Sequence, residues 1–335
     1  MPRLTLDFHG ASVSLESDDA AVLADLRRDF AAFEASPGSE AVVRLRLCGK
    51  ACALPRGTAL WGWRDFRASA GSRTRLIRWD DGSWAHHDRG GLEAEIHARE
   101  PGRLRELAYL AVLSRAGEEL DRRGLHRVHA LGFTYEGRAG LVLLPSRGGK
   151  SSLALEMLKR GEPGLLSDES PIVSRDGLVR PFPLRLALRE REALAGAPAA
   201  AVSPFKRRGY AEKFTVAPEA LGAGFAAGAP LRWLFAGSRT PGAPRFSPLP
   251  LPHALAALGS SMVVGVGLTQ MAEYMLRADP RLAGIAASRL KAAVSLARRA
   301  DARRFDLGSE GPAAALDALL AGLREPGKDA GAAPR

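Results

Sequence analysis

The first hundred residues show short alternations of apolar and polar positions that predict strands. Leu4, Leu6 and Phe8 alternate with polar residues, and the same spacing recurs at Val13 and Leu15. Ser17-Asp18-Asp19 can cap a helix, and apolar residues at helical spacing follow it: Val22, Leu23, Leu26, Phe30 and Phe33. Residues 43–47 and 76–79 fit further strands. We therefore expect a small α+β region over residues 1–123.

The pattern changes after Gly124, which follows a helix predicted over residues 103–121. The next residues predict a β-hairpin, a loop, a helix and a strand: residues 130–135, a turn at 136–138, an apolar strand at 141–144, a helix at 151–160 and a strand at 164–167. The strand, helix and second strand form a βαβ unit. We therefore expect residues 124–325 to form an α/β domain.

The patterns after the βαβ unit are weaker. Short strands flank the turn at Asp176-Gly177, and a Pro- and Ala-rich run to about Ser203 predicts a loop with one short helix. A buried strand is predicted at 231–236, and helices are predicted at 262–276 and 281–299. Residues 326–335 contain mostly Gly, Ala, Pro and charged residues, which predicts a disordered tail.

The loop before the helix of the βαβ unit has the composition of a phosphate-binding loop: Pro145-Ser146-Arg147-Gly148-Gly149-Lys150-Ser151. Such a loop aims backbone N–H groups and the positive end of the helix dipole at a polyphosphate. We expect Lys150, exposed in the loop, to reach the β- and γ-phosphates, and Ser151 to bind Mg²⁺. The predicted nucleotide-binding residues are Ser146, Arg147, Gly148, Gly149, Lys150, Ser151 and Ser152.

This loop departs from the full pattern G-x-x-x-x-G-K-[ST], because Leu144 occupies the first Gly position. Gly-Gly-Lys-Ser by itself is also typical of an ordinary polar turn, so a structural turn between strand and helix is the alternative. The context favours phosphate binding, because an apolar strand precedes the loop and an amphipathic helix follows it.

Two acidic residues, Asp168 and Glu169, follow the next predicted strand. Ligands gather at the carboxyl ends of strands in an α/β sheet. We expect Asp168 to act as the base for an acceptor hydroxyl and Glu169 to act on the metal side. The alternative is a solvated pair of acids at a strand end.

These residues resemble the HPr kinase/phosphorylase family of bacterial P-loop kinases. In that family a His precedes a hairpin, a strand enters a Gly-Lys-Ser loop, the next helix ends in a basic-Gly pair, and the following strand ends in two Asp. The matching positions here are His129, the loop through Lys150-Ser151, Lys159-Arg160-Gly161 and Asp168-Glu169. The resemblance covers residues 125–180 and extends more loosely to about 325.

The resemblance implies a carboxykinase-like α/β catalytic domain, with ATP and Mg²⁺ as cofactors and γ-phosphoryl transfer to a hydroxyl group. It implies that Asp168 is the base and His129 a second active-site residue, although a lone His beside a strand is also typical of simple packing. Leu144, Ser152 and Glu169 depart from the family pattern. The chain is therefore more similar to the divergent HPr-kinase-like proteins, some of which phosphorylate modified peptides or small metabolites.

A basic segment after the βαβ unit contains Lys206, Arg207, Arg208 and Lys213. Fixed cations stabilise the charge that develops during phosphoryl transfer, so a clamp on phosphate or on an acidic substrate is one interpretation. A solvated loop is the other. The segment alone does not decide between them.

The composition changes this picture little. The net charge is +11, but only seven of the 48 basic residues are Lys and the Arg residues are scattered among acids, so we do not expect nucleic acid to bind. The N-terminus does not resemble a signal peptide, and no apolar run is long enough to span a bilayer, so we expect a cytoplasmic protein without membrane contact.

The sequence thus predicts a kinase that phosphorylates a hydroxyl of a peptide, a protein or a small molecule. A nucleotide-binding regulator and an NTPase or carboxykinase-type phosphotransferase are the alternatives. The sequence leaves the acceptor open, and it allows a homo-oligomer.

Overall fold

The computed structural model describes residues 1–36, 41–49, 58–63, 66–70, 74–88, 90, 92–194, 196–209, 211–265 and 281–325. The chain forms two compact units, one of Met1–Leu120 with Lys206–Ala211 and one of Asp121–Phe205 with Glu212–Arg335. The part of the predicted helix from residue 266 to 276 and the predicted tail at 326–335 lie outside the described residues.

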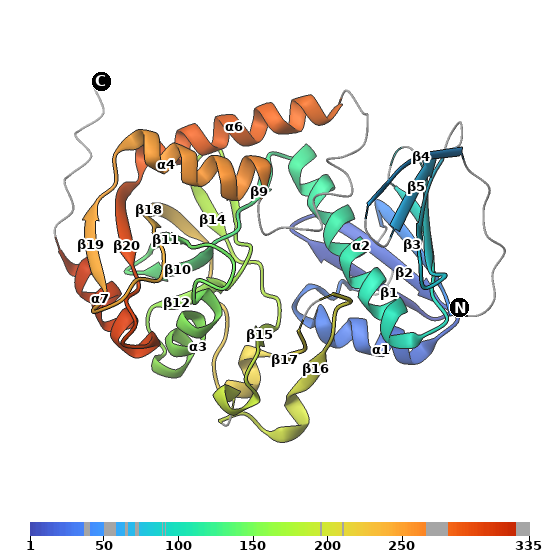
Figure 1. Cartoon of the computed structure of the whole chain (residues 1–335), viewed down its shortest axis with the longest axis horizontal. Coiled ribbons are helices and arrows are strands. Elements are labelled where there is room, and N and C mark those ends of the chain that lie inside the picture. The colour runs from blue at the N-terminus through green and yellow to red at the C-terminus, as the bar shows by residue number, and fades with distance from the viewer. Residues whose placement is uncertain are drawn as a thin grey trace. The chain divides into compact units, whose positions relative to one another are not determined.

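The first unit contains an eight-stranded sheet and two helices (Figure 1). In sheet order the strands are β1 (Arg3–Phe8), β2 (Ala11–Ser17), β3 (Val43–Cys48), β8 (Glu93–His97), β7 (Trp84–Asp88), β6 (Thr74–Trp79), β5 (Phe66–Ala70) and β4 (Thr58–Trp63). Helix α1 (Ala20–Asp29) begins after Asp19, whose side chain accepts hydrogen bonds from the first turn. The predicted strands at 4–8, 43–47 and 76–79 and the predicted helix after Asp19 are therefore confirmed.

The long helix α2 (Pro101–Arg122) leads into the second unit, whose main sheet contains nine strands. The strands are β9 (Leu125–Arg127), β10 (Leu131–Tyr135), β11 (Arg138–Leu143), β12 (Gly164–Ser167), β13 (Ile172–Ser174), β14 (Leu178–Arg180), β18 (Ala229–Ala236), β19 (Arg245–Pro248) and β20 (Asp301–Asp306).

The predicted βαβ unit is present as β11, α3 (Lys150–Arg160) and β12. Strand β10 lies between β11 and β12 and pairs with both in antiparallel fashion, so β11 and β12 run in the same direction. Strand β11 also pairs with β18, and β18 with β20, in parallel fashion. The carboxyl ends of β12, β11, β18 and β20 therefore lie at one edge of the sheet, and the α/β class is confirmed.

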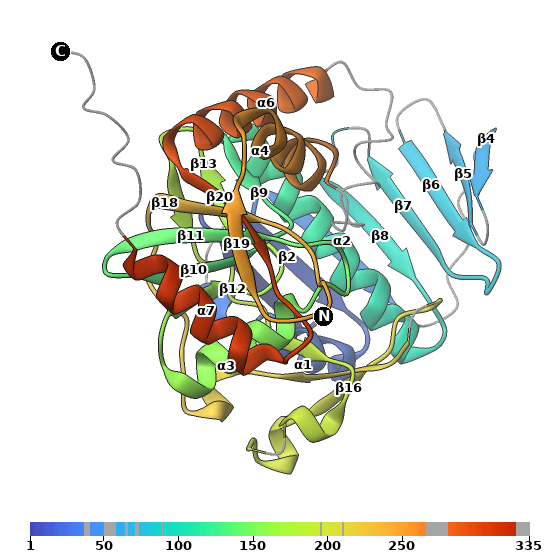
Figure 2. The same cartoon turned by 60° about the vertical axis from the view of Figure 1, so that its left-hand side comes forward.

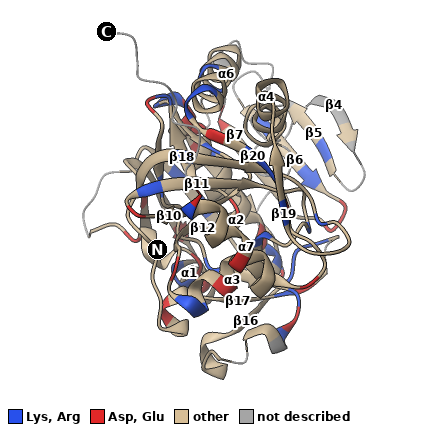
Figure 3. Cartoon of the chain, turned by 90° about the vertical axis from the view of Figure 1, so that its left-hand side faces the viewer, with Lys and Arg blue, Asp and Glu red and all other residues tan. Residues whose placement is uncertain are grey.

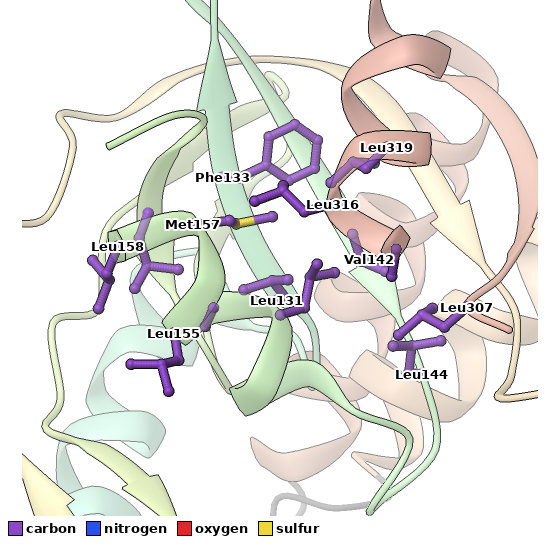
Figure 4. Packing of buried hydrophobic residues seen from close by; sticks show 14 of the residues in the cluster. Leu131, Phe133, Val142, Leu144, Leu155, Met157, Leu158, Leu307, Leu316 and Leu319 are labelled. Carbon is purple, nitrogen blue, oxygen red and sulfur yellow. The ribbon is translucent and has the colours of Figure 1, made fainter. Parts of the chain in front are cut away.

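Helices cover both faces of this sheet because its central strands are apolar on both sides. Val142 and Leu144 pack with residues of α3 and α7 (Pro312–Arg324), and Figure 4 shows them beside Leu307. Leu141 and Leu143 pack on the other face with α4 (Leu251–Leu258) and α6 (Arg281–Arg299). Figure 2 shows α3 and α7 side by side, and Arg160 of α3 pairs with Asp317 of α7.

Two of the predictions after the βαβ unit were wrong in part. The run to Ser203 contains a strand, β15 (Leu186–Leu188), and two 3-10 turns, η2 (Arg191–Leu194) and η3 (Ala199–Ala201). Strand β15 joins β17 (Lys213–Val216) and β16 (Ser203–Phe205) in a three-stranded sheet, because Leu186 and Leu188 are buried in the core with α3. The predicted helix from residue 262 begins earlier, as the π-helical turn η5 (Gly259–Val264) that continues α4.

The remaining described elements include one more 3-10 turn, η1 (Ala31–Phe33), in the first unit and another, η4 (Pro218–Leu221), in the second. Within the described ranges, no helix is long and apolar enough to cross a membrane. In the view of Figure 3, segments with acidic residues lie among those with basic residues. The expectation that nucleic acid does not bind stays a prediction.

Candidate functional site

The loop between β11 and α3 folds as a tight turn around glycine residues. The backbone N–H of Gly148 donates to the carbonyl oxygen of Pro145 at 3.0 Å, and a Cβ at Gly148 would lie 2.9 Å from that oxygen. Gly149 has a φ of 101° and Arg147 a φ of 66°, both in the left-handed region. The turn therefore requires the absence of a side chain at position 148 and favours Gly at position 149.

Lys150 is the first residue of α3, and its side chain is buried, with only 7% of the residue exposed. Its Nζ donates hydrogen bonds to the carbonyl oxygens of Leu144 at 2.6 Å and Pro145 at 3.1 Å. The expectation that Lys150 is exposed was wrong, because the loop closes over the ammonium group. Burial lowers the pKa of Lys150 to about 8, against the opposing effect of Glu169 and Asp168.

Asp168 follows β12 and faces the start of α3. The hydroxyl of Ser151 donates to Oδ2 of Asp168 at 3.2 Å, so the structure brings the two predicted residues together. Asp168 is buried, and burial together with the charge of Glu169 raises its pKa to about 7, although Ser151 and Lys213 oppose this shift. Glu169 itself is exposed. A carboxyl with this pKa changes its protonation state near neutral pH.

His129 lies in the connection between β9 and β10. Its backbone N–H donates to the carbonyl oxygen of Ser261 in η5 at 3.0 Å, whereas both ring nitrogens are buried without a hydrogen-bond partner among the described residues. Burial and the charge of Lys150 lower the pKa of His129 to about 4, against the effect of Glu169. The imidazole is therefore neutral at pH 7 and close enough to Lys150 and Glu169 to interact with their charges.

Sequence reasoning missed the residues that β18 and β20 add to the same edge. The N–H of Gly237, after β18, donates to the carbonyl oxygen of Leu143 at the end of β11, at 3.1 Å. Ser238 donates its N–H to Oδ1 of Asp306 at the end of β20, at 3.2 Å. The signal was an apolar run ending in Gly-Ser, which marks a strand end but does not show which strand lies beside it.

The residues of the predicted clamp belong to different units. Lys213 begins β17 in the second unit and acts electrostatically on Lys150 and Asp168. Lys206, Arg207 and Arg208 belong to the first unit. There the N–H of Arg208 donates to a carboxylate oxygen of Glu106 at 2.9 Å, and its guanidinium donates to Asp81 at 2.7 Å.

The start of α3 is suited to phosphate oxygens. The first backbone N–H groups of a helix have no partner inside the helix, and Gly149 places no side-chain cap on α3. Ser146, Arg147 and Ser152 are exposed around this helix start. The hydroxyl of Ser151 and the carboxylate of Glu169 are oxygen donors of the kind that Mg²⁺ prefers. No group of three or more His, Cys, Asp and Glu side chains suited to a metal ion occurs within the described ranges.

Comparison with known proteins finds no family model and no curated protein sequence that matches the chain.

Proposed function

We propose that the chain is an ATP-dependent kinase that transfers the γ-phosphoryl group to a hydroxyl of a peptide, a protein or a small molecule. The observation that carries this proposal is the position of the buried Asp168. Its carboxyl accepts a hydrogen bond from Ser151, and Ser151 follows the glycine loop that closes over Lys150. A carboxyl with a pKa of about 7 is suited to general base catalysis, because a large fraction is ionised at neutral pH and the ionised form is still basic enough to take a proton.

The arrangement of elements also supports a P-loop domain of the HPr-kinase-like, carboxykinase-like type. The loop follows β11, α3 follows the loop, and the acidic pair follows β12 at the same edge of the sheet. This is the order on which the resemblance to the HPr kinase/phosphorylase family rests. The N-terminal unit carries no part of this argument, and we assign it no role in transfer.

The residues present fit Mg²⁺ together with ATP. The hydroxyl of Ser151 and the exposed carboxylate of Glu169 offer two oxygen donors for the ion, and Asp168, whose Oδ2 lies 3.2 Å from the Ser151 hydroxyl, is left to act as the base. Bound Mg²⁺ would neutralise charge on the phosphate oxygens. This ion commonly takes one or two protein carboxylates and fills its other positions with phosphate oxygens and water.

The chain's own residues have separable tasks in the proposed reaction. Backbone N–H groups at the start of α3 bind the phosphates, and Lys150 places a positive charge beside them. Asp168 orients the acceptor hydroxyl and takes its proton as the oxygen attacks the γ-phosphorus, while the bond from that phosphorus to the β–γ bridging oxygen breaks and ADP leaves. Lys213 adds a second cation on the side of Asp168. Neutral His129 donates or accepts a hydrogen bond but adds no charge.

The first test is nucleotide binding by the full chain. We expect ATP to bind with Mg²⁺ present and to bind more weakly after the ion is removed with a chelator, because the loop provides donors and the ion neutralises phosphate charge. Isothermal titration calorimetry measures both affinities. The proposal is contradicted when the unmutated protein shows no nucleotide binding with Mg²⁺ present.

A nucleotide-binding regulator is the second candidate, and one observation favours it. The Lys150 ammonium is bonded to carbonyl oxygens of its own loop, so it must leave them before it can contact a phosphate. A protein that binds ATP but phosphorylates no acceptor would have this second function.

A further inference from the structure

Arg147, in the loop before α3, has a backbone conformation that is unfavourable for residues other than glycine. Its φ is 66°, in the left-handed region, where the Cβ of an L-residue crowds the backbone. A glycine at this position would avoid that cost. The presence of an Arg side chain here therefore calls for an explanation.

Hairpin turns account for the two other described non-glycine residues with positive φ. His9 (φ 55°) precedes Gly10 between β1 and β2, and Glu136 (φ 46°) precedes Gly137 between β10 and β11. Two-residue hairpin loops of this type need positive φ at both positions. The loop that contains Arg147 joins a strand to a helix, so no hairpin accounts for its conformation.

The backbone of the loop explains the positive φ of Arg147 but not its side chain. Arg147 and Gly149 have positive φ on either side of Gly148, whose φ is not positive. Alternation of this kind turns successive N–H groups toward one side and forms a concave anion site. A glycine would support the same conformation with less strain. The backbone therefore gives no reason for a guanidinium at this position.

The guanidinium of Arg147 is available to a ligand. The residue is exposed, and no hydrogen bond or ion pair joins it to another described residue. Lys150 differs, because its ammonium is buried and donates to two carbonyl oxygens. The charges that act on Lys150 and Asp168 include Lys213 but not Arg147, so the Arg147 guanidinium lies away from both. It is thus a cation on the solvent side of the loop.

We propose that Arg147 binds substrate in the proposed reaction, through contacts of its guanidinium with oxygens of the ATP phosphates on the solvent side of the loop. This role rests on the proposed function for the identity of the ligand. A planar guanidinium fork matches two phosphate oxygens and stays charged. Arg147 lies three residues before Lys150, the first residue of α3, so its side chain is long enough to reach phosphates held at the helix start.

The test measures the binding of Mg²⁺-ATP and of Mg²⁺-tripolyphosphate to the full chain by isothermal titration calorimetry. Arg147→Met should weaken both about tenfold or more, because a charge-assisted fork is lost. Arg147→Lys should have an intermediate effect, because it keeps the charge but not the fork. The matched control is Arg138→Met, which removes another exposed Arg at the amino end of β11 and should leave both affinities unchanged.

A second variant, Arg147→Gly, separates the side chain from the backbone. Glycine keeps the positive φ, so this variant should bind both ligands as weakly as Arg147→Met does. Its unfolding temperature without ligand should rise by roughly 1–3 °C, because the strain is relieved. The control Glu136→Gly relieves the same kind of conformation in a hairpin turn and should leave both affinities unchanged.

Three results would overturn this role: unchanged affinities in Arg147→Met or Arg147→Gly, an equal loss in Arg138→Met, and a lower unfolding temperature in Arg147→Gly. If Arg147→Met does not fold, Arg147→Gly decides alone. No binding of either ligand by the unmutated protein would overturn this role together with the proposed function. Tripolyphosphate binding that depends on Arg147, in a protein that phosphorylates no acceptor, would reject the proposed function and keep this role.

Discussion

Two groups of buried polar side chains in the second unit differ in how completely they are paired. The paired network consists of Asp121, His126 and Arg289, and the loop cluster consists of His129, Lys150 and Asp168. In the paired network, Arg289 binds both carboxylate oxygens of Asp121, and His126 binds one of them at 2.8 Å. In the loop cluster, Lys150 donates to carbonyl oxygens and forms no ion pair with an acid among the described residues. The ring nitrogens of His129 have no hydrogen-bond partner among the described residues.

The pKa values follow this difference. Burial tends to raise the pKa of Asp121, but the hydrogen bond from His126 and the charge of Arg289 outweigh it and lower the pKa. Burial raises the pKa of Asp168 to about 7, because Ser151 and Lys213 compensate only in part. Both carboxyls are buried, so the difference between their pKa values comes from their hydrogen bonds and neighbouring charges and not from burial. A paired group holds the fold, whereas an incompletely paired one is available to a ligand.

The largest effect should come from breaking the paired network. Arg289→Met removes the guanidinium that binds both carboxylate oxygens of the buried Asp121, and we expect a loss of about 3–5 kcal/mol in the free energy of unfolding. Urea denaturation measures it. The double variant Asp121→Leu/Arg289→Met removes both charges and should recover much of that stability. A loss below about 1 kcal/mol in the single variant would show that this network does not hold the fold.

The second-largest effect should come from a change in the loop cluster, and it should lower the rate of phosphoryl transfer. Lys150→Ala should lower phosphoryl transfer by about 10²- to 10³-fold, because one aimed charge is lost beside the phosphates. The fold should survive, because the partners of the ammonium among the described residues are two carbonyl oxygens of its own loop. Circular dichroism checks the fold, and a radioactive phosphate assay checks the transfer. Near-normal turnover in a folded variant would remove Lys150 from the site.

A smaller effect should appear in how the free energy of unfolding changes with pH. The pKa of Asp168 is raised to about 7, so the protonated carboxyl stabilises the folded chain at low pH, and this contribution is lost as the pH rises from about 4 to 7. A shift of about three units corresponds to at most about 4 kcal/mol. Allowing for the desolvation of the amide, we expect Asp168→Asn to be about 2 kcal/mol more stable than the unmutated protein at pH 8.

The same variant should show little gain at pH 4, where the carboxyl of Asp168 is already protonated in the folded chain. Thermal or urea unfolding at the two pH values gives both differences. An equal gain at pH 4 and pH 8 would mean that the ionisation of Asp168 does not contribute, and that its pKa is not raised.

The sequence predicted the parts of the site that local chemistry determines. Gly148 and Gly149 mark a loop that only small residues can form, and Asp168 marks a strand end, so their positions followed from spacing alone. The neighbours of the loop could not be predicted in this way. Gly237 lies beside Leu143 only because β18 pairs with β11, and a single sequence does not specify which distant strands pair.

Other features could not be predicted from the sequence for similar physical reasons. Strand β15 has three residues, too few for a clear alternation, and its burial depends on α3. The burial of Lys150 depends on how the loop closes and not on the residue types within it. The hairpin of β10 and β11 was predictable, because a turn joins two adjacent apolar runs.

The most direct test of the central claim measures two quantities on Asp168→Asn, the affinity for Mg²⁺-ATP and the rate of transfer to an acceptor. Candidate acceptors are peptides, proteins and small molecules with hydroxyl groups. We expect the affinity to change by less than about threefold, because the amide keeps the shape of the carboxyl, and the transfer rate to fall by about 10²-fold or more. If Asp168 instead holds the metal, affinity and rate should fall together, and Glu169 becomes the candidate base. Unchanged transfer by Asp168→Asn would contradict the account.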